Sequence, residues 1–211
     1  MKQLLLLLAI FSMQVGFAQS QQDDLAITLG ATTFPKFGDT GIGFDLSARY
    51  YLTDAFSLGG NFYTASPKFN HGFGYETDRT LLNIYAINVP LEYDVINTEK
   101  FTLGLGFSNG LLLNVLRNRN KTKEVTYYDD DTGIWYTSQV PVRIKTDVYY
   151  LLTPFADASL KILTLEKQDA SMFLTAKASY QNAFGNGAFS RPNDFRSYMF
   201  SVGITIKGST K

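Results

Sequence analysis

The sequence contains no cysteine and little charge. The absence of cysteine excludes disulfide-stapled scaffolds, thiolate metal sites and cysteine nucleophiles. Basic and acidic residues number 19 each, so the chain lacks the strongly basic footprint of a nucleic-acid-binding protein. Charged residues make up 18% of the chain, against roughly 25% in ordinary soluble domains, whereas 45% is hydrophobic and 15% aromatic. These proportions exclude a disordered chain and indicate a surface that is not wholly in contact with water.

The first 18 residues are typical of an export signal. Lys2 supplies a positive start, an unbroken apolar stretch follows from Leu4 to Phe11, and Gly16-Phe17-Ala18 places small residues where a signal peptidase reads them. The apolar stretch is shorter than the ~20 residues that a membrane-spanning helix needs. We therefore expect cleavage after Ala18, with residues 19–211 forming one exported domain.

Beyond residue 19 the chain alternates between apolar and polar residues with a period of two, which is the pattern of a β-strand. In the clearest segment, 41–52, the even-numbered residues are all apolar, whereas the odd-numbered ones include Asp45, Ser47 and Arg49. No stretch shows a convincing helical period. The pattern predicts an all-β chain with eight strands, at 24–34, 41–52, 56–63, 81–95, 101–116, 147–163, 170–183 and 195–207.

The connections between these segments alternate in length along the chain. The odd-numbered ones cover 35–40, 66–80, 117–146 and 184–194, and the even-numbered ones are shorter on average, at 53–55, 96–100 and 164–169. In an up-and-down antiparallel sheet, odd and even connections lie at opposite ends. Short turns at one end and longer loops at the other are typical of outer-membrane barrels.

Alternation also fits a soluble barrel of the lipocalin kind, in which the interior is apolar and the exterior polar. The polar face of the predicted strands favours a membrane barrel, because it carries few charges and equal numbers of acids and bases. Such a balance suits a closed lumen filled by polar side chains, where an ion must be paired and hydrogen-bonded. We predict a lumen charge network of Asp45, Arg49, Glu92, Asp94, Asp157, Lys161, Lys177 and Lys207.

Aromatic residues on the apolar face cluster toward the strand ends, as in the two interfacial girdles of a membrane barrel. The sequence therefore predicts an eight-stranded antiparallel up-and-down transmembrane β-barrel in the cell outer membrane, with a lumen too narrow for a general porin. The predicted girdles are Tyr50, Phe56, Tyr93 and Phe101 at the short-turn end, and Phe62, Tyr85, Tyr150 and Tyr198 at the long-loop end.

Residues 87–93 read Ile-Asn-Val-Pro-Leu-Glu-Tyr, and a glycine-rich segment, Leu103-Gly104-Leu105-Gly106-Phe107, follows after a short turn. This arrangement resembles the outer-membrane β-barrel domain proteins common in Bacteroidota. The resemblance implies an outer-membrane location and often no known activity. We also expect contact with membrane lipid and with the outer-membrane assembly machinery. The chain departs from many bacterial barrels in ending Lys-Gly-Ser-Thr-Lys rather than in an aromatic. Because Pro90 lacks a ladder donor, we expect a bulge or local break beside it.

Some eight-stranded barrels are similar in build and modify membrane lipid through His, Ser and acidic residues near the outer rim. The single histidine, His71, lies in the second long connection with Ser66 and Asp78. Nearness in sequence does not supply the hydrogen-bond reach that a catalytic triad needs. Residues 129–133, Asp-Asp-Asp-Thr-Gly, lack the spacing of a calcium loop and predict a tight turn. We expect no cofactor and no metal.

The third long connection holds two candidate contact regions. Residues 124–137 alternate around the predicted turn and carry several aromatics, so we expect a hairpin beyond the membrane that can recruit a protein partner by strand addition. Four cations alternate where the fifth strand leaves the apolar band: Arg117, Arg119, Lys121 and Lys123. They either contact phosphates of the outer-leaflet lipid or form a solvated stripe.

The favoured hypothesis is a non-enzymatic integral outer-membrane protein that serves a structural or surface-interaction role. Two alternatives remain open from the sequence: an outer-membrane enzyme that modifies lipid, and a secreted soluble barrel that binds a ligand.

Overall fold

A computed structural model of the chain describes residues 22–37, 39–165 and 169–209, and the expected export signal at 1–18 lies outside them. Eight long antiparallel strands form the molecule, and a pairing between β3 and β5 closes their sheet into a barrel. The described residues hold no helix that is long and apolar enough to cross a membrane. The long strands are β1 (Asp24–Lys36), β2 (Asp39–Tyr51), β3 (Phe56–Ala65), β5 (Thr80–Asn97), β6 (Phe101–Asp129), β7 (Ile134–Leu165), β8 (Ala170–Phe184) and β9 (Ser197–Ser209).

Consecutive long strands are neighbours throughout, so the prediction of an eight-stranded up-and-down barrel is confirmed. A ninth strand, β4 (Lys68–Phe69), was not predicted and pairs with the start of β5 inside the second long connection. The last long connection carries a 3-10 helix, η2 (Pro192–Phe195). The prediction that the last strand begins at Phe195 is wrong, because Phe195 ends η2 and β9 begins at Ser197. The Phe195 ring turns into the barrel and is 1% exposed.

Side chains alternate between the two faces of the wall, as the period of two predicts. On β2, Leu46 is 39% exposed on the outside, whereas Arg49 on the inside is 7% exposed. The exposed large hydrophobic residues on the outer face come from all eight long strands and include Ile27, Ile42, Leu58, Ile87, Leu105, Val148, Leu174 and Val202. The middle of the barrel wall thus has an apolar outer face and buries charges such as Arg49 and Glu92 inside, which is the reverse of a soluble barrel.

Pro90 causes an interruption on one side only. On the β6 side, Pro90 pairs in register with Ser108, and no bulge occurs there. On the other side, the pairing of β5 with β3 stops at Leu58–Leu91 and resumes in the same register at Asn61–Asn88. The expected local break is therefore a gap in one ladder, and the register shift of β5 lies farther on, between Asp94 and Ile96.

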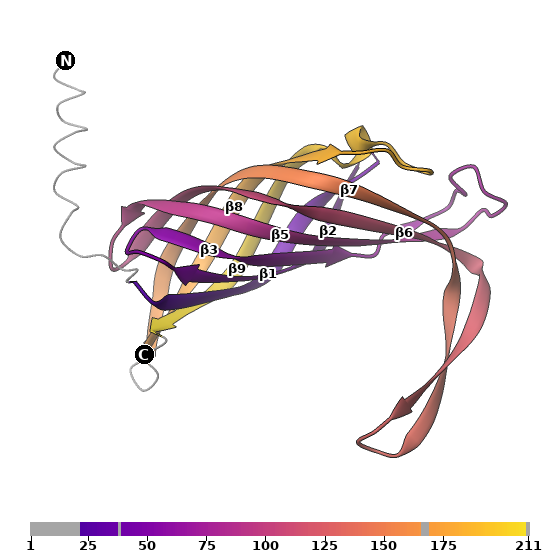
Figure 1. Ribbon diagram of the computed structural model, residues 1–211, viewed down its shortest axis with the longest axis horizontal. Helices are drawn as coiled ribbons and strands as arrows, with labels where there is room; N and C mark the ends of the chain where they lie inside the picture. The colour runs from indigo at the N-terminus through magenta and orange to yellow at the C-terminus, as the bar shows by residue number, and fades with distance from the viewer. Residues whose placement is uncertain (1–21, 38, 166–168, 210–211) are drawn as a thin grey trace.

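β6 and β7 continue as a paired hairpin far beyond the ends predicted at Leu116 and Asp147. Figure 1 shows this hairpin leaving the long-loop end of the barrel and bending sharply away from it. Two irregularities interrupt its ladder, one after Leu116 and a larger one between Asn118 and Thr122. Extra residues on one strand of a ladder bend and twist it, which accounts for the change of direction. Most of the connection predicted at 117–146 is therefore strand.

The prediction of a wholly polar lumen is wrong for the half nearest the long loops. That half holds an apolar core of Phe34, Tyr63, Leu82, Ile84, Leu112, Tyr149, Leu151 and Phe195, each at most 4% exposed. The physical reason lies in segments such as 81–87 of β5, which are apolar on both faces. There, Leu82 and Ile84 fill the lumen while Tyr85 and Ile87 face outward.

Candidate functional site

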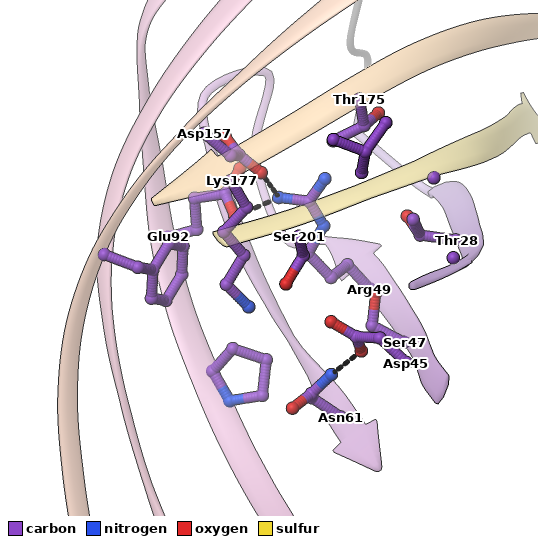
Figure 2. Close-up of a pocket in the computed structure, with 15 residues that line it drawn as sticks. Thr28, Asp45, Ser47, Arg49, Asn61, Glu92, Asp157, Thr175, Lys177 and Ser201 are labelled. Atoms are coloured by element: carbon purple, nitrogen blue, oxygen red, sulfur yellow. Dashed lines mark hydrogen bonds and ion pairs between the residues drawn. The ribbon is translucent and has the colours of Figure 1, made fainter. Parts of the chain in front are cut away.

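The centre of the lumen is organised by Arg49 of β2, which reaches across to the opposite wall. Its guanidinium forms ion pairs with Glu92 of β5 and with Asp157 of β7, the latter at 3.1 Å from Nη1 to Oδ2. All three side chains are at most 8% exposed. Figure 2 shows Arg49 and Asp157 turned toward each other inside the barrel. One cation is thus shared by two carboxylates, so that its removal would leave two buried acids without their partner.

Gly104 of β6 makes room for these carboxylates. It lies on the lumen face between Asp94 of β5 and Asp157 of β7. A β-carbon at this position would come within 2.6 Å of carboxylate oxygens of both Glu92 and Asp157. The glycine-rich segment that follows the Pro-Leu motif therefore has a steric function, since it leaves space for the interior charge cluster.

The uncharged groups around this cluster form two hydrogen-bonded chains. On one wall, Asn61 donates to Asp45 and accepts from Asn88. On the other wall, four hydroxyls from four successive strands link at 2.6 to 2.8 Å, in the order Ser159, Thr175, Thr205 and Thr28. Because buried polar groups are costly without partners, these chains stabilise a narrow closed interior.

The remaining predicted lumen charges occupy different positions. Asp94 is 5% exposed and lies on the same face of β5 as Glu92. The ammonium of Lys207 lies over the ring of Tyr51 at 4.3 Å, near the short-turn end, and that of Lys177 over Phe155 at 4.6 Å.

The structure does not bring Lys161 into the central cluster. Its ammonium pairs at 3.6 Å with Glu99, an exposed residue of the β5–β6 turn. Lys161 therefore belongs to the rim.

Little free space remains between these side chains. The central cavity, bordered by Arg49, Glu92 and Asp157 among others, has a volume of about 30 Å³. A second cavity, which shares Asp45 and Asn61 with the first, measures about 20 Å³. Such volumes suit one or two water molecules and are far below the several hundred Å³ of a small-molecule site. The arrangement favours a packed, polar interior over a ligand cavity.

The long loops close the lumen at their end, a feature that the sequence analysis missed. Asp147 of β7 accepts hydrogen bonds from the backbone N–H groups of Ala188, Phe189 and Ser190 at 2.7 to 3.1 Å, and from the Ser190 hydroxyl at 2.7 Å. The sequence offered one signal for this role of Asp147: alternation places the residue on the lumen face, two positions before Tyr149. Aromatic rings from the first, second and fourth loops meet above the lumen and form an aromatic cap of Phe37, Phe69, Phe73, Phe189 and Phe195.

The histidine considered for catalysis lies at the edge of this cap. The His71 ring contacts Phe73 at 4.0 Å and Phe69 at 5.3 Å between ring centroids. Asp78 instead accepts a hydrogen bond from Asn120, which lowers the pKa of its carboxyl below the usual value. Among the described residues, no hydrogen bond joins the His71 ring to Ser66 or Asp78, and no group of three or more candidate metal ligands occurs.

The predicted turn at 129–133 is confirmed as the tip of the long hairpin. Gly133 donates its N–H to the carbonyl of Asp129 at 2.8 Å and has a positive φ of 69°, which glycine adopts without strain. Next to the tip, Tyr127 packs on Tyr136 across the ladder, with 5.6 Å between ring centroids, and Tyr128 packs on Trp135 at 5.0 Å. All four rings are exposed.

The four predicted lipid-contact cations fall in different environments. Arg117 is half-buried against the barrel wall, where its Nη1 donates to the carbonyl of Pro141 at 3.1 Å. Arg119 and Lys121 lie within the irregularity of the hairpin ladder, and Lys123 lies beyond it on the projecting part. The structure therefore separates Arg117 from the other three.

Comparison with known proteins finds no matching family model and no matching curated protein. Solved structures do match. The attachment invasion locus protein Ail of Yersinia pestis has a TM-score of 0.50 at 11% identity, over 89% of this chain and 99% of that one. Neisserial surface protein A has a TM-score of 0.48 at 13% identity, over 88% and 95%. The N-terminal β-barrel domain of Pseudomonas aeruginosa OprF has a TM-score of 0.42 at 14% identity, over 88% and 98%.

At 11% identity, the likeness to Ail concerns the fold alone. It agrees with the strand order and the closed sheet described above. The chain is accordingly an all-β, antiparallel, eight-stranded barrel of the outer-membrane type.

Proposed function

We propose that the chain is a non-enzymatic integral protein of the cell outer membrane, of the kind common in Bacteroidota, with a structural or surface-interaction role. The observation that carries this proposal is the combination of an apolar outer face and a charged, filled interior. Large residues such as Ile42, Ile87 and Tyr198 are 66 to 79% exposed on the outside, whereas the Arg49 cluster is buried. In water this arrangement would expose far more apolar surface than a soluble monomer tolerates.

The packed lumen supports a role that involves neither conduction nor catalysis. A path through the barrel would have to pass the Arg49 cluster, the apolar core and the aromatic cap. The cavity at the Arg49 cluster measures only about 30 Å³. The contacts of His71 and Asp78 leave no basis for a triad on the second loop. The alternatives of a lipid-modifying enzyme and a ligand-binding barrel therefore have no site among the described residues to support them.

The projecting hairpin supports the surface-interaction part of the proposal. β5 pairs with β6 only as far as Asn118, and β8 pairs with β7 only as far as Tyr150. Residues 124–137 consequently have unpaired outer edges and carry four exposed aromatic rings. A partner protein that adds a strand to such an edge would gain backbone hydrogen bonds and aromatic contacts.

Expression of the full chain in a Gram-negative host tests the proposal. We expect the protein in the outer-membrane fraction, after insertion by the outer-membrane assembly machinery, and a different electrophoretic mobility in SDS before and after boiling. A hairpin variant that lacks residues 124–137 should insert in the same way. Recovery of the parent protein in the soluble periplasmic or culture fraction without detergent would overturn the membrane location.

A further inference from the structure

A row of cations crosses the outer wall at the long-loop end. In the ladders, Lys68 of β4 pairs with Leu81 of β5, Leu81 pairs with Arg117 of β6, and Arg117 pairs with Arg143 of β7. Directly paired residues in an antiparallel sheet have their side chains on the same face. The three cations among them, Lys68, Arg117 and Arg143, form the cation row.

The cation row faces outward. Leu116 and Asn118, which flank Arg117, are 0% and 7% exposed on the lumen side, so Arg117 between them points away from the lumen. Phe69, next to Lys68, packs against the apolar core inside the barrel. Lys68 therefore points outward as well.

The row has an excess of positive charge without a protein counter-ion. Like charges directly opposite each other in a sheet are destabilising, and Arg117 and Arg143 are such a pair. Among the described residues, no carboxylate forms an ion pair with Lys68, Arg117 or Arg143. The Nε atom of Arg117 is buried without a hydrogen-bond partner. An external anion at the exposed side of the row would offset the repulsion between the two arginines.

The cation row lies next to the apolar outer face, on its long-loop side. On the same outer face, Leu113 pairs with Val148 and Leu111 pairs with Tyr150, and these residues are 36 to 55% exposed. Arg117 follows Leu113 by four residues, which is roughly 10 Å along the barrel axis for a strand tilted by about 40°. A headgroup held at the row would therefore have its acyl chains beside Leu111 and Val148.

We propose that the cation row binds the phosphate of an anionic lipid of the surrounding leaflet, whose acyl chains lie on the adjoining apolar wall. This inference rests on the proposed membrane location. Arginine suits the site because its planar guanidinium binds phosphate with two parallel hydrogen bonds. Lys121 and Lys123 lie farther along the hairpin and are not part of the site.

The test uses the full-length mature protein in neutral dodecyl maltoside micelles, with either dimyristoyl phosphatidic acid or dimyristoyl phosphatidylcholine added. Native mass spectrometry counts the lipids that remain bound. We expect the parent to retain phosphatidic acid in preference to phosphatidylcholine. The double variant Arg117→Gln/Arg143→Gln should lose roughly tenfold or more in affinity for phosphatidic acid, because two charge-assisted contacts are removed.

The matched control is Lys121→Gln/Lys123→Gln, which removes the same charge from the projecting hairpin and should bind as the parent does. Should the arginine double variant fail to fold, Arg143→Gln alone carries the test. Among the described residues, the exposed Arg143 side chain forms no hydrogen bond or ion pair that the substitution would remove, and the substitution should still weaken binding severalfold. Equal losses in the two double variants, no loss in either, or full displacement by inorganic phosphate would overturn the inference.

Insertion into vesicles separates failure of this inference from failure of the proposed membrane location. If lipid preference is absent and the parent still inserts into phosphatidylcholine vesicles, only this inference fails. If the parent does not insert at all, the proposed location fails too.

Discussion

Gly104 and Asp157 approach each other so closely across the β6–β7 ladder that no side chain fits between them. A β-carbon on Gly104 would lie 2.5 Å from Oδ1 of Asp157. The backbone of β6 therefore limits where the two carboxylates around Arg49 can lie. A substitution of the uncharged Gly104 therefore tests the packing of the charge cluster around Arg49.

Substitution of this glycine should destabilise the barrel through overpacking. We expect Gly104→Ala to lower the free energy of unfolding by about 1–3 kcal/mol, because the added methyl group displaces the carboxylates of Glu92 and Asp157. Gly60→Ala is the control, since a β-carbon at Gly60 meets nothing within 4 Å. Urea unfolding of both variants in lipid vesicles measures the difference. Equal midpoints for the two variants would contradict the steric function of Gly104.

Removal of the shared cation should have a larger effect. Arg49→Leu leaves Glu92 and Asp157 buried without their counter-ion, which should cost about 3 kcal/mol or more in the free energy of unfolding. Ser57→Ala should be nearly neutral, because its hydroxyl is buried without a hydrogen-bond partner. Asn61→Ala should fall between the two, since its amide bonds both Asp45 and Asn88. An unfolding midpoint for Arg49→Leu equal to that of the parent would rule out a stabilising central ion cluster.

Closure of the lumen by the fourth loop depends on one carboxylate. Asp147→Asn keeps the size of the side chain but replaces one acceptor oxygen by a donor that faces the N–H groups of Phe189 and Ser190. We expect faster hydrogen exchange of the amides at 188–190 than in the parent. Asp130→Asn at the hairpin tip should leave these amides unchanged. Unaltered exchange in Asp147→Asn would show that the loop is held by the aromatic cap instead.

The period-two pattern was sufficient to predict the barrel wall, because alternation directly records which face each side chain occupies. The eight predicted strands match the eight long ones, and Asp45, Arg49, Glu92 and Asp157 were assigned to the lumen from alternation alone. Strand ends were less predictable. The wall pattern stops near Leu116, where both faces of the hairpin enter water and alternation no longer reports on pairing.

The parts that the sequence did not reveal depend on contacts between distant segments. Loop closure joins Asp147 to residues 188–190, and the aromatic cap joins three separate loops, so neither leaves a local pattern. The cation row was also hidden, because Lys68, Arg117 and Arg143 lie on different strands. Only the register of the ladders brings them together, whereas the alternation from Arg117 to Lys123 relates residues along a single strand.

The outward orientation of the second strand can be tested without relying on stability. Leu46→Lys should cost roughly 2–4 kcal/mol if the residue lies near the middle of a bilayer, but burial in a soluble cavity would also destabilise the protein. A labelling experiment avoids this ambiguity, because the parent contains no cysteine that would react. Leu46→Cys in vesicle-inserted protein should react with a lipid-soluble maleimide and remain protected from a water-soluble one. Val125→Cys on the projecting hairpin, at a position 37% exposed, should react with both reagents. Rapid labelling of Leu46→Cys by the water-soluble reagent, in protein that is folded and inserted, would refute the assignment of this face to lipid.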